Sequence, residues 1–594
     1  MSVPERPVIY QLLPRLFGNA VETRKTHGTL AENGCGKFAD ISDAALASLN
    51  AMGSTHLWLT GVLEQASGTA YPDRPADVPD ILKGIAGSPY AIKDCFDVCP
   101  DYALDPAKRL DEFKELLDRC HGHGLKVIID FVPNHVARSY HSDVRPELSF
   151  GEGDDRSVFF SRDNHFYYLR PTDPGGGPPL KLPTAGQPGC SGLLAPEGEW
   201  GRVSGNNVVS WSPSIQDWYE TVKLNYGHDF TTGRDTTHLP GCDAAIDEVP
   251  KTWRTMDAVL QWWQDMGVDG FRVDMAHMIP MEFWHWSIKR ARGRDPRVFF
   301  SAEAYDNDPA KLTDRHVLDA LLEAGFDAVY DALEDLYDAG KWANDLDALT
   351  FTGGRFHRSL RYAENHDEVR LASPKTWAGM GMHVGRPVTA VLFGMGRGPL
   401  MIYSGQEVGE PAAGEEGFSG DDARTTIFDY WSMPELVKWV NGGKFDGGLL
   451  SPEQRELREW YGRLIQLTRE PAFTRGEFYG LNHANKDNPT YGRLDGERTS
   501  GHWLYAYLRY DSGSRQAFLV IANFHGSAAI ADAWLRLPEH ALGWLGIGAG
   551  DALRFEERLA EPWAAGADAA SLPEAGLPLP PLPPLSARII ELSR

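Results

Sequence analysis

The sequence predicts an α/β protein: a (β/α)8 TIM barrel with a subdomain inserted after strand three and a C-terminal antiparallel β-sandwich domain. Three observations predict this fold class. Short β-rich runs alternate with helical stretches from residue 7 to about 470. An interval of more than one hundred residues, 138–250, interrupts that alternation. After about residue 471 the helical stretches stop, and β-rich runs follow one another directly.

Eight β-rich runs are candidate barrel strands. Each has the continuous apolar character that is typical of parallel strands buried on both faces. They are PVIYQLL (7–13), THLWLTG (55–61), KVIIDFV (126–132), GFRVDM (270–275), VFFSAEA (298–304), DAVYDA (327–332), RSLRYAEN (358–365) and PLMIYSG (399–405).

One helix between these strands can be predicted in detail. Asp105 and Pro106 supply an N-cap and a proline in the first turn, and Gly122 and Gly124 end the helix before strand three. Its apolar stripe consists of Leu110, Phe113, Leu116 and Leu117. Strand, helix and strand at this spacing form the repeating unit of a barrel.

The alternation also predicts the boundaries of three units. The barrel comprises 1–137 and 251–470, the inserted subdomain 138–250, and the β-sandwich 471–594. The insertion is rich in glycine, proline and aromatic residues, and a structureless loop of that length is unusual in a compact domain. We therefore expect a small subdomain that overhangs the mouth of the barrel. We expect the β-sandwich to be a structural partner of the barrel, not a separate ligand-binding module.

Composition excludes several classes of partner. The formal net charge of −25 argues against binding to nucleic acid or to an anionic membrane surface. No apolar run reaches the roughly 18–20 residues that span a bilayer. The start, MSVPERPVIYQLL, lacks the pattern of a signal peptide, and the six cysteines are expected to be free thiols. Together these observations favour the cytoplasm, and they leave the oligomeric state open.

Four short strings carry the candidate chemistry. They are DFVPNH (130–135), GFRVDMAH (270–277), SAEA (301–304) and ENHDE (364–368), each at the end of a predicted strand. In a barrel of parallel strands the carboxyl ends of different strands converge on one pocket. We therefore expect Asp274, Glu303 and Asp367 to lie together, with Arg272, His135 and His366 around them.

Three carboxyl groups with a neighbouring cation suit the cleavage of a glycosidic bond with retention. Such a reaction needs a carboxylate nucleophile and a carboxylic acid, about 5–5.5 Å apart. Asp274 is the nucleophile candidate, and Arg272 on the same strand face is expected to depress its pKa. Glu303 is the general acid/base candidate because its apolar surroundings favour the protonated form. Asp367 would stabilise the positive charge that grows at the anomeric carbon.

Taken singly, each of these groups has an ordinary structural explanation. An Asp at a strand end is usually a helix cap, and an isolated Arg-x-Asp pair is usually a structural ion pair. The joint appearance of all four strings, in order and on successive predicted strands, is what favours the catalytic interpretation.

The strings resemble the conserved regions of the α-amylase family of glycoside hydrolases, in the family's order. The resemblance covers most of the chain. It implies that Asp274 is the nucleophile, Glu303 the general acid/base and Asp367 the transition-state stabiliser. It further implies a set of residues around the sugar at the cleavage site. These are Arg272, His135, His366, the aromatic platform Tyr90 and its polar neighbour Asp94.

The sequence departs from the family pattern after the nucleophile. Where true α-amylases commonly have a Lys-His pair that contributes to a sugar site and a calcium site, this chain has His277 and Met278. His277 is kept as a substrate-binding candidate, and a backbone carbonyl could still serve a metal. Asn134 matches the family's calcium-linked Asn, so calcium is a candidate ligand there. No cofactor is expected to be required.

We expect a retaining glycosidase that cleaves α-1,4-glucosidic bonds of malto-oligosaccharides or starch-type α-glucans. A transglycosylating glucanotransferase or a sucrose- or trehalose-converting enzyme shares the covalent intermediate and stays open. A non-catalytic binding scaffold would be expected to have lost the triad, and all three carboxyl groups are present.

Overall fold

The computed structural model describes residues 6–184, 189–194, 197–338, 340–414, 417–418 and 420–594. Seven parallel strands form a curled sheet in the order β10-β9-β8-β5-β2-β1-β11, which is the expected (β/α)8 barrel. The strands are β1 (Val8–Leu12), β2 (His56–Leu59), β5 (Lys126–Phe131), β8 (Gly270–Val273), β9 (Phe299–Glu303), β10 (Ala328–Tyr330) and β11 (Leu400–Tyr403). Seven of the eight predicted strands are therefore confirmed.

The eighth predicted strand, 358–365, is not a regular strand. Ser359 forms an isolated parallel bridge with Val329 of β10, and Arg361 forms one with Leu400 of β11. The N–H of Ser359 donates to Arg355 O in the preceding turn, so it is used locally instead of in the ladder. The segment still lies between β10 and β11 and closes the barrel.

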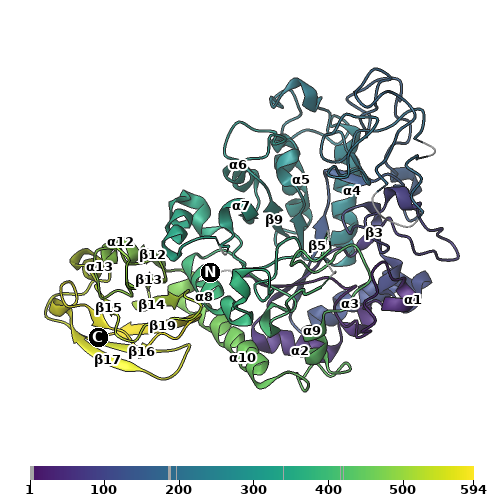
Figure 1. Cartoon of the computed structure of the whole chain (residues 1–594). Helices are drawn as coiled ribbons and strands as arrows, with labels where there is room; N and C mark the ends of the chain where they lie inside the picture. Colours follow the sequence, from purple (N-terminus) through teal and green to yellow (C-terminus); the bar gives the residue numbers. More distant parts are fainter. Residues whose placement is uncertain (1–5, 185–188, 195–196, 339, 415–416, 419) are drawn as a thin grey trace.

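Helices surround the barrel (Figure 1). The longer ones are α2 (Asp43–Met52), α3 (Arg109–Gly122), α4 (Lys251–Met266), α5 (Met281–Arg294), α6 (Val317–Ala324), α8 (Gly385–Met395), α9 (Pro434–Val440) and α10 (Pro452–Leu467). Short helical turns are α1 (Leu30–Asn33), α7 (Ala332–Asp335) and α11 (Pro471–Thr474).

The helix that was predicted in detail is confirmed as α3. The Asp105 side chain accepts a hydrogen bond from the N–H of Ala107 and caps a 3-10 turn that leads into α3. The buried face comprises Phe113, Leu116, Leu117 and Cys120. Gly124 has a φ of +72°, which lets the chain reverse into β5.

The insertion between β5 and α4 contains little regular structure (blue, upper right in Figure 1). At its base β6 (His135–Ala137) pairs antiparallel with β7 (Thr221–Lys223). A separate aromatic core, which includes Phe159, Tyr167 and Trp211, stabilises it. A short hairpin of β3 (Leu63–Gln65) and β4 (Ile92–Val98) lies in the loop after β2. The subdomain boundaries remain a prediction.

The C-terminal part is an antiparallel sheet in the order β12-β13-β14-β19-β16-β17, with a small second sheet of β15 and β18. Its strands are β12 (Glu477–Gly480), β13 (Leu504–Asp511), β14 (Gln516–Asn523), β15 (Trp534–Leu535), β16 (Ala552–Glu557), β17 (Ala564–Asp568), β18 (Leu577–Pro578) and β19 (Ser586–Ser593). The helices here are α12 (Asn482–Asn485) and α13 (Glu539–Trp544). Along β13 the residues alternate: Tyr505 and Tyr507 join the barrel core, while Leu504, Ala506 and Leu508 join a second core.

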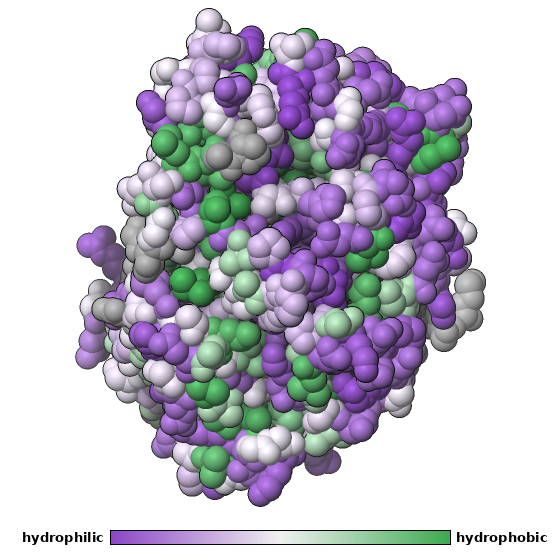
Figure 2. Space-filling model, turned by 90° about the vertical axis from the view of Figure 1, so that its right-hand side faces the viewer, coloured by the Kyte–Doolittle hydropathy of each residue, from purple (hydrophilic) through white to green (hydrophobic). Residues whose placement is uncertain are grey.

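One face of the surface is shown in Figure 2. On the face in Figure 2, hydrophilic residues predominate and apolar residues form small separate groups. Among the described residues, no helix is both long enough and apolar enough to cross a bilayer. No disulfide joins the cysteines of these residues.

Candidate active site

Arg272 organises the predicted carboxyl groups. It lies on β8, is almost completely buried, and its Nη1 is 2.8 Å from Oδ1 of Asp274. Its Nη2 is 2.8 Å from Oε2 of Glu303, at the end of the neighbouring strand β9. Because β8 and β9 are parallel, with Val273 opposite Ala302, both carboxyl groups emerge at the same end of the barrel. A single guanidinium therefore holds the two groups together.

Further contacts fix the orientation of this guanidinium. Its Nε donates to the hydroxyl of Tyr330 at 3.0 Å, and its Nη1 lies 3.4 Å from Oδ1 of Asp130. Asp130 is in turn fixed by the N–H of Gly61 at 2.8 Å. The ring of Trp58 lies against the guanidinium, with its centroid 5.1 Å away. Asp130 stands in the first of the four strings, and it was not among the predicted site residues.

The backbone after the nucleophile candidate is left-handed. Met275 has a φ of +46°, a conformation that is uncommon for residues other than glycine. Its N–H donates to Oε2 of Glu303 at 3.2 Å. The hydroxyl of Tyr305 donates to the other oxygen, Oε1, at 3.2 Å. Glu303 is therefore held from both sides.

Asp367 is positioned through its neighbours. Its N–H donates to the side-chain oxygen of Asn365 at 2.8 Å, and its Oδ2 is 3.0 Å from Nε2 of His366. The same nitrogen lies 2.5 Å from the hydroxyl of Tyr90, whose ring stacks on His366 at 5.4 Å. On the far side of the imidazole, the amide nitrogen of Gln11 donates to Nδ1 at 2.7 Å. The acceptor Nδ1 favours the tautomer with its proton on Nε2.

The carboxyl groups differ in their pKa. Burial and the neighbouring Glu303 raise the pKa of Asp274 well above its usual range, although Arg272 opposes them. Arg272 lowers this pKa as expected, but burial and the second carboxylate outweigh it, so the pKa is raised on balance. Burial also raises the pKa of Asp367, but His366 and Arg272 overcome it and leave the pKa lowered.

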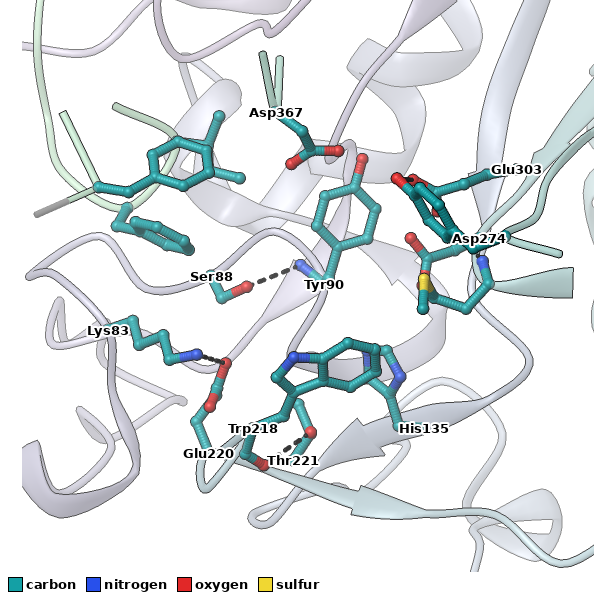
Figure 3. Close-up of a pocket in the computed structure, with 15 residues that line it drawn as sticks. Lys83, Ser88, Tyr90, His135, Trp218, Glu220, Thr221, Asp274, Glu303 and Asp367 are labelled. Atoms are coloured by element: carbon teal, nitrogen blue, oxygen red, sulfur yellow. Dashed lines mark hydrogen bonds and ion pairs between the residues drawn. The ribbon is translucent and has the colours of Figure 1, made fainter. Parts of the chain in front are cut away.

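These groups open into one cavity of about 280 Å³ (Figure 3). Five of the predicted residues line it: Asp274, Glu303, Asp367, Tyr90 and His135. The other lining residues were not predicted: Lys83, Ser88, Trp218, Glu220, Thr221, Met275, Tyr305, Phe418, Ile427 and Phe428. Thr221 begins β7 and Met275 directly follows Asp274, whereas most of the others come from loops of irregular spacing.

His135 joins the barrel to the inserted subdomain. It begins β6, and its ring lies 5.2 Å from that of Trp218. Burial, with the nearby Lys223 and Lys83, lowers the pKa of His135 to about 3, so the ring is neutral at neutral pH. A neutral imidazole can offer one donor and one acceptor to a sugar hydroxyl.

Four predicted substrate-binding residues lie outside the cavity lining: Arg272 and His366, whose contacts are described above, and Asp94 and His277. The carboxylate of Asp94 accepts from the N–H of Phe96 at 2.8 Å and of Asp143 at 2.9 Å, so it connects β4 to the start of the insertion. His277 is buried, and its Nε2 contacts Asp308 at 2.8 Å. Its ring packs 5.7 Å from Tyr305, which does line the cavity. His277 thus supports the lining without being part of it.

The residues around Asn134 do not fit a calcium ion. The side-chain oxygen of Asn134 accepts a hydrogen bond from the ammonium of Lys223, which also donates to Met278 O at 3.2 Å. These are the two oxygens that the family resemblance places near calcium. Calcium needs six to eight oxygen ligands, and an ammonium at this position would repel it. The expectation that Asn134 holds calcium is not supported.

The model of the family described as "Alpha amylase, catalytic domain" matches residues 11–313, slightly more than half of the chain. The chain belongs to the alpha-amylase family. Its curated relatives include proteins named alpha-amylase and alpha-glucosidase.

Individual relatives are distant. An alpha-amylase of Streptomyces lividans is 24% identical over 81% of this chain, and the match spans 50% of that protein. An alpha-1,4-glucan:maltose-1-phosphate maltosyltransferase of Pseudomonas aeruginosa is 31% identical over 28% of the chain and 24% of its own length. The chain therefore spans half or less of the length of these two relatives.

The fold is shared with solved structures along almost the whole chain. The alpha-amylase of Geobacillus thermoleovorans in complex with acarbose has a TM-score of 0.57 and 16% identity, over 99% of this chain and 98% of that one. The trehalose-6-phosphate hydrolase of Bacillus licheniformis has a TM-score of 0.57 and 16% identity, over 99% of both chains. These likenesses concern the fold.

Proposed function

We propose that this alpha-amylase family enzyme is a retaining glycosidase that cleaves α-1,4-glucosidic bonds of malto-oligosaccharides or starch-type fragments. The observation that carries the proposal is the shared guanidinium: Arg272 contacts both Asp274 and Glu303 at 2.8 Å. Asp367 opens into the same cavity over Tyr90. Two carboxyl groups held side by side suit a covalent mechanism with retention.

In the first step Glu303, as the acid, gives its proton to the glycosidic oxygen. Asp274 attacks the anomeric carbon, the bond to that oxygen breaks, and a glycosyl ester on Asp274 remains. The shortened saccharide leaves. In the second step Glu303, now a carboxylate, takes a proton from water while the water oxygen attacks the anomeric carbon. The ester breaks, Asp274 leaves as a carboxylate, and two inversions give net retention.

The mechanism needs Asp274 in its ionised form, although its pKa is raised. The Glu303 carboxylate is one cause of this rise, so a proton on Glu303 removes that cause and favours ionised Asp274. The productive form carries a proton on Glu303 and leaves Asp274 ionised. Arg272 contacts both groups and stabilises the remaining negative charge.

Asp367 and Tyr90 act on the sugar between these two steps. The lowered pKa of Asp367 keeps its carboxylate negative, which favours the positive charge at the anomeric carbon. The face of Tyr90 offers an apolar platform for a sugar ring. His135 lines the cavity beside that ring, and His366 contacts Tyr90 and Asp367 through its Nε2.

Transfer to a second sugar uses the same intermediate and is the competing function. The relative in Pseudomonas aeruginosa is named a maltosyltransferase, at 31% identity over part of the chain. Water and a sugar hydroxyl compete for the ester on Asp274. The accumulation of saccharides longer than the starting substrate would assign transfer in place of hydrolysis.

The test is incubation with maltoheptaose and with soluble starch, followed by product separation and proton NMR of freshly formed product. We expect shorter maltosaccharides, with the α-anomer appearing first. Glu303→Gln should lower kcat by about 10²–10⁴, and Asp274→Asn should lower it by several orders of magnitude. Asp295→Asn, which alters a partly exposed carboxylate at the end of α5 and outside the cavity lining, is the matched control. No cleavage of any α-glucan, or the β-anomer appearing first, would contradict the proposal.

A further inference from the structure

The cavity has a charged pair at the end that is remote from Glu303. Nζ of Lys83 lies 3.0 Å from Oε1 of Glu220, and both residues line the cavity. Figure 3 shows Tyr90 and Trp218 between this pair and the carboxyl groups of Asp274 and Glu303. The pair joins the loop after β2 to the inserted subdomain.

Three chain segments are tied together at this end. The hydroxyl of Tyr219 donates to Leu82 O at 3.1 Å, which connects the subdomain to the loop after β2. The N–H of Ala86 donates to Phe428 O at 3.1 Å, which connects the same loop to the one after β11. A side chain at Gly84 would meet Phe428 O at 2.0 Å, so only glycine permits this approach. The end of the cavity is therefore built from interlocked backbone.

The roles of Glu303 and Asp274 indicate which part of the substrate lies at the end of the cavity that Lys83 and Glu220 form. Glu303 protonates the oxygen of the leaving group, so the leaving saccharide lies on the side of Glu303, Met275 and Tyr305. The sugar that is attacked stacks on Tyr90 with its anomeric carbon towards Asp274. Its outer hydroxyl lies across the ring from the anomeric carbon and thus faces away from Glu303, towards Lys83 and Glu220. A longer chain on that side would have to pass through this end.

The pair also offers hydrogen bonds that a sugar terminus could use. Oε2 of Glu220 is buried and has no hydrogen-bond partner among the described residues. Lys83 is partly exposed and donates towards only one oxygen of Glu220. A buried acceptor without a partner is costly, and a hydroxyl group of a terminal sugar would satisfy it.

Resting on the proposed function, we infer that Lys83 and Glu220 close the glycone side of the cavity and make the enzyme selective for non-reducing chain ends. The enzyme would then release a mono- or disaccharide from the end of an α-glucan and would not cut inside the chain. The ligand class is a saccharide end with free outer hydroxyls.

The test compares two maltoheptaosides that carry the same fluorophore at the reducing end. One has a free non-reducing terminus, and in the other a cyclic acetal blocks the outer hydroxyls of that terminus. We expect the blocked substrate to be cleaved at least about 100-fold more slowly. The free substrate should yield labelled products that shorten stepwise from the non-reducing end. Equal rates, or labelled fragments of all lengths from the start, would overturn the inference.

Variants link the selectivity to the charged pair. Lys83→Ala combined with Glu220→Ala opens this end and should raise the ratio of blocked to free turnover at least about tenfold. Lys83→Met is the milder variant, which retains most of the apolar side chain if the double variant folds poorly. Lys93→Ala removes a similar ion pair, with Asp77 at 3.0 Å, outside the cavity lining. It should leave the ratio unchanged.

The outcomes separate this inference from the function on which it rests. Turnover of neither substrate would contradict the proposed function, and the inference with it. Equal turnover of both substrates would contradict the inference alone. An unchanged ratio in Lys83→Met and in the double variant would assign the selectivity to other residues and overturn the role of the pair.

Discussion

Arg272 is the positively charged partner of several carboxyl groups in the site. It is buried, and three carboxyl groups lie around it, those of Asp130, Asp274 and Glu303. Buried charges are stable only when they are paired and hydrogen-bonded, so these groups depend on one another. The planar guanidinium contacts two carboxyl groups through different nitrogens, which an ammonium cannot reproduce in this geometry. The charge of Glu303 thus affects Asp274 directly, and the two carboxyl groups also share Arg272 as a partner.

This coupling predicts a shift in pH dependence when Glu303 loses its charge. Activity requires ionised Asp274, so the acid limb of kcat/KM follows its pKa, which the Glu303 carboxylate raises. In Glu303→Gln that contribution is gone, and the acid limb should move to lower pH. An aryl α-glucoside with a good leaving group permits the measurement, because it needs no proton from Glu303. The control is Asp295→Asn, and a limb that stays in place or moves upward would show that Glu303 does not raise this pKa.

At the scale of elements, the hairpin of β6 and β7 attaches the inserted subdomain to the barrel. Lys223 on β7 reaches the side chain of Asn134 and the carbonyl of Met278, so its ammonium joins three segments that a metal ion would otherwise hold. Burial lowers the pKa of Lys223 to about 7. The cost of this burial is offset by contacts with two carbonyl oxygens.

The structure therefore predicts stability that is independent of calcium. A chelator should leave Tm and activity unchanged. Lys223→Met should lower the free energy of unfolding by about 1–3 kcal/mol, because it leaves two buried oxygens without a donor. The folded-state pKa lies below the unfolded value of 10.5, so the unfolded chain binds more protons between about pH 7 and 10.5. Across that window the wild type should gain stability with rising pH relative to Lys223→Met, in chemical denaturation series. Loss of Tm in the chelator would contradict this prediction.

The elements also show what the sequence could predict. Seven strands and α3 were recognisable because their apolar runs, caps and glycines are local signals. Asp274, Glu303 and Asp367 could be placed together because strand ends converge in a barrel. Asp94 and His277 were assigned to the substrate from their motif positions alone, whereas local hydrogen bonds direct them elsewhere.

Other site residues depended on contacts that are remote in the sequence. Lys223 lies 89 residues after Asn134, and no local pattern pairs them. Lys83 and Glu220 meet only because two loops of unrelated spacing fold over the same mouth. The segment 358–365 has the apolar pattern of a strand, but a turn uses the N–H of Ser359. Irregular backbone of this kind leaves no periodic signal.

At the scale of the whole molecule, the barrel and the C-terminal sheet share one core. Tyr507 of β13 donates to Val391 O of α8 at 2.8 Å. The buried guanidinium of Arg509 donates to Gly394 O at 3.0 Å and to Gly476 O at 2.6 Å. Because one face of the sheet belongs to the barrel core, removal of the sheet would expose the apolar surface of α8. This packing agrees with the expectation that the sheet is a structural partner of the barrel.

The segment 358–365, which closes the barrel beside Asp367, is expected to be the place where the barrel unfolds locally. Neighbouring strands elsewhere share three or four paired residues, whereas 358–365 contributes one bridge to each neighbour. Local unfolding begins where few backbone hydrogen bonds must break. Deuterium should therefore replace the amide hydrogens of Leu360 and Arg361 sooner than those of β8 and β9. A saccharide inhibitor held by Asp367 should slow that exchange, as mass spectrometry of peptic fragments would detect. Uniform protection around the ring of strands would mean that the barrel opens only by global unfolding.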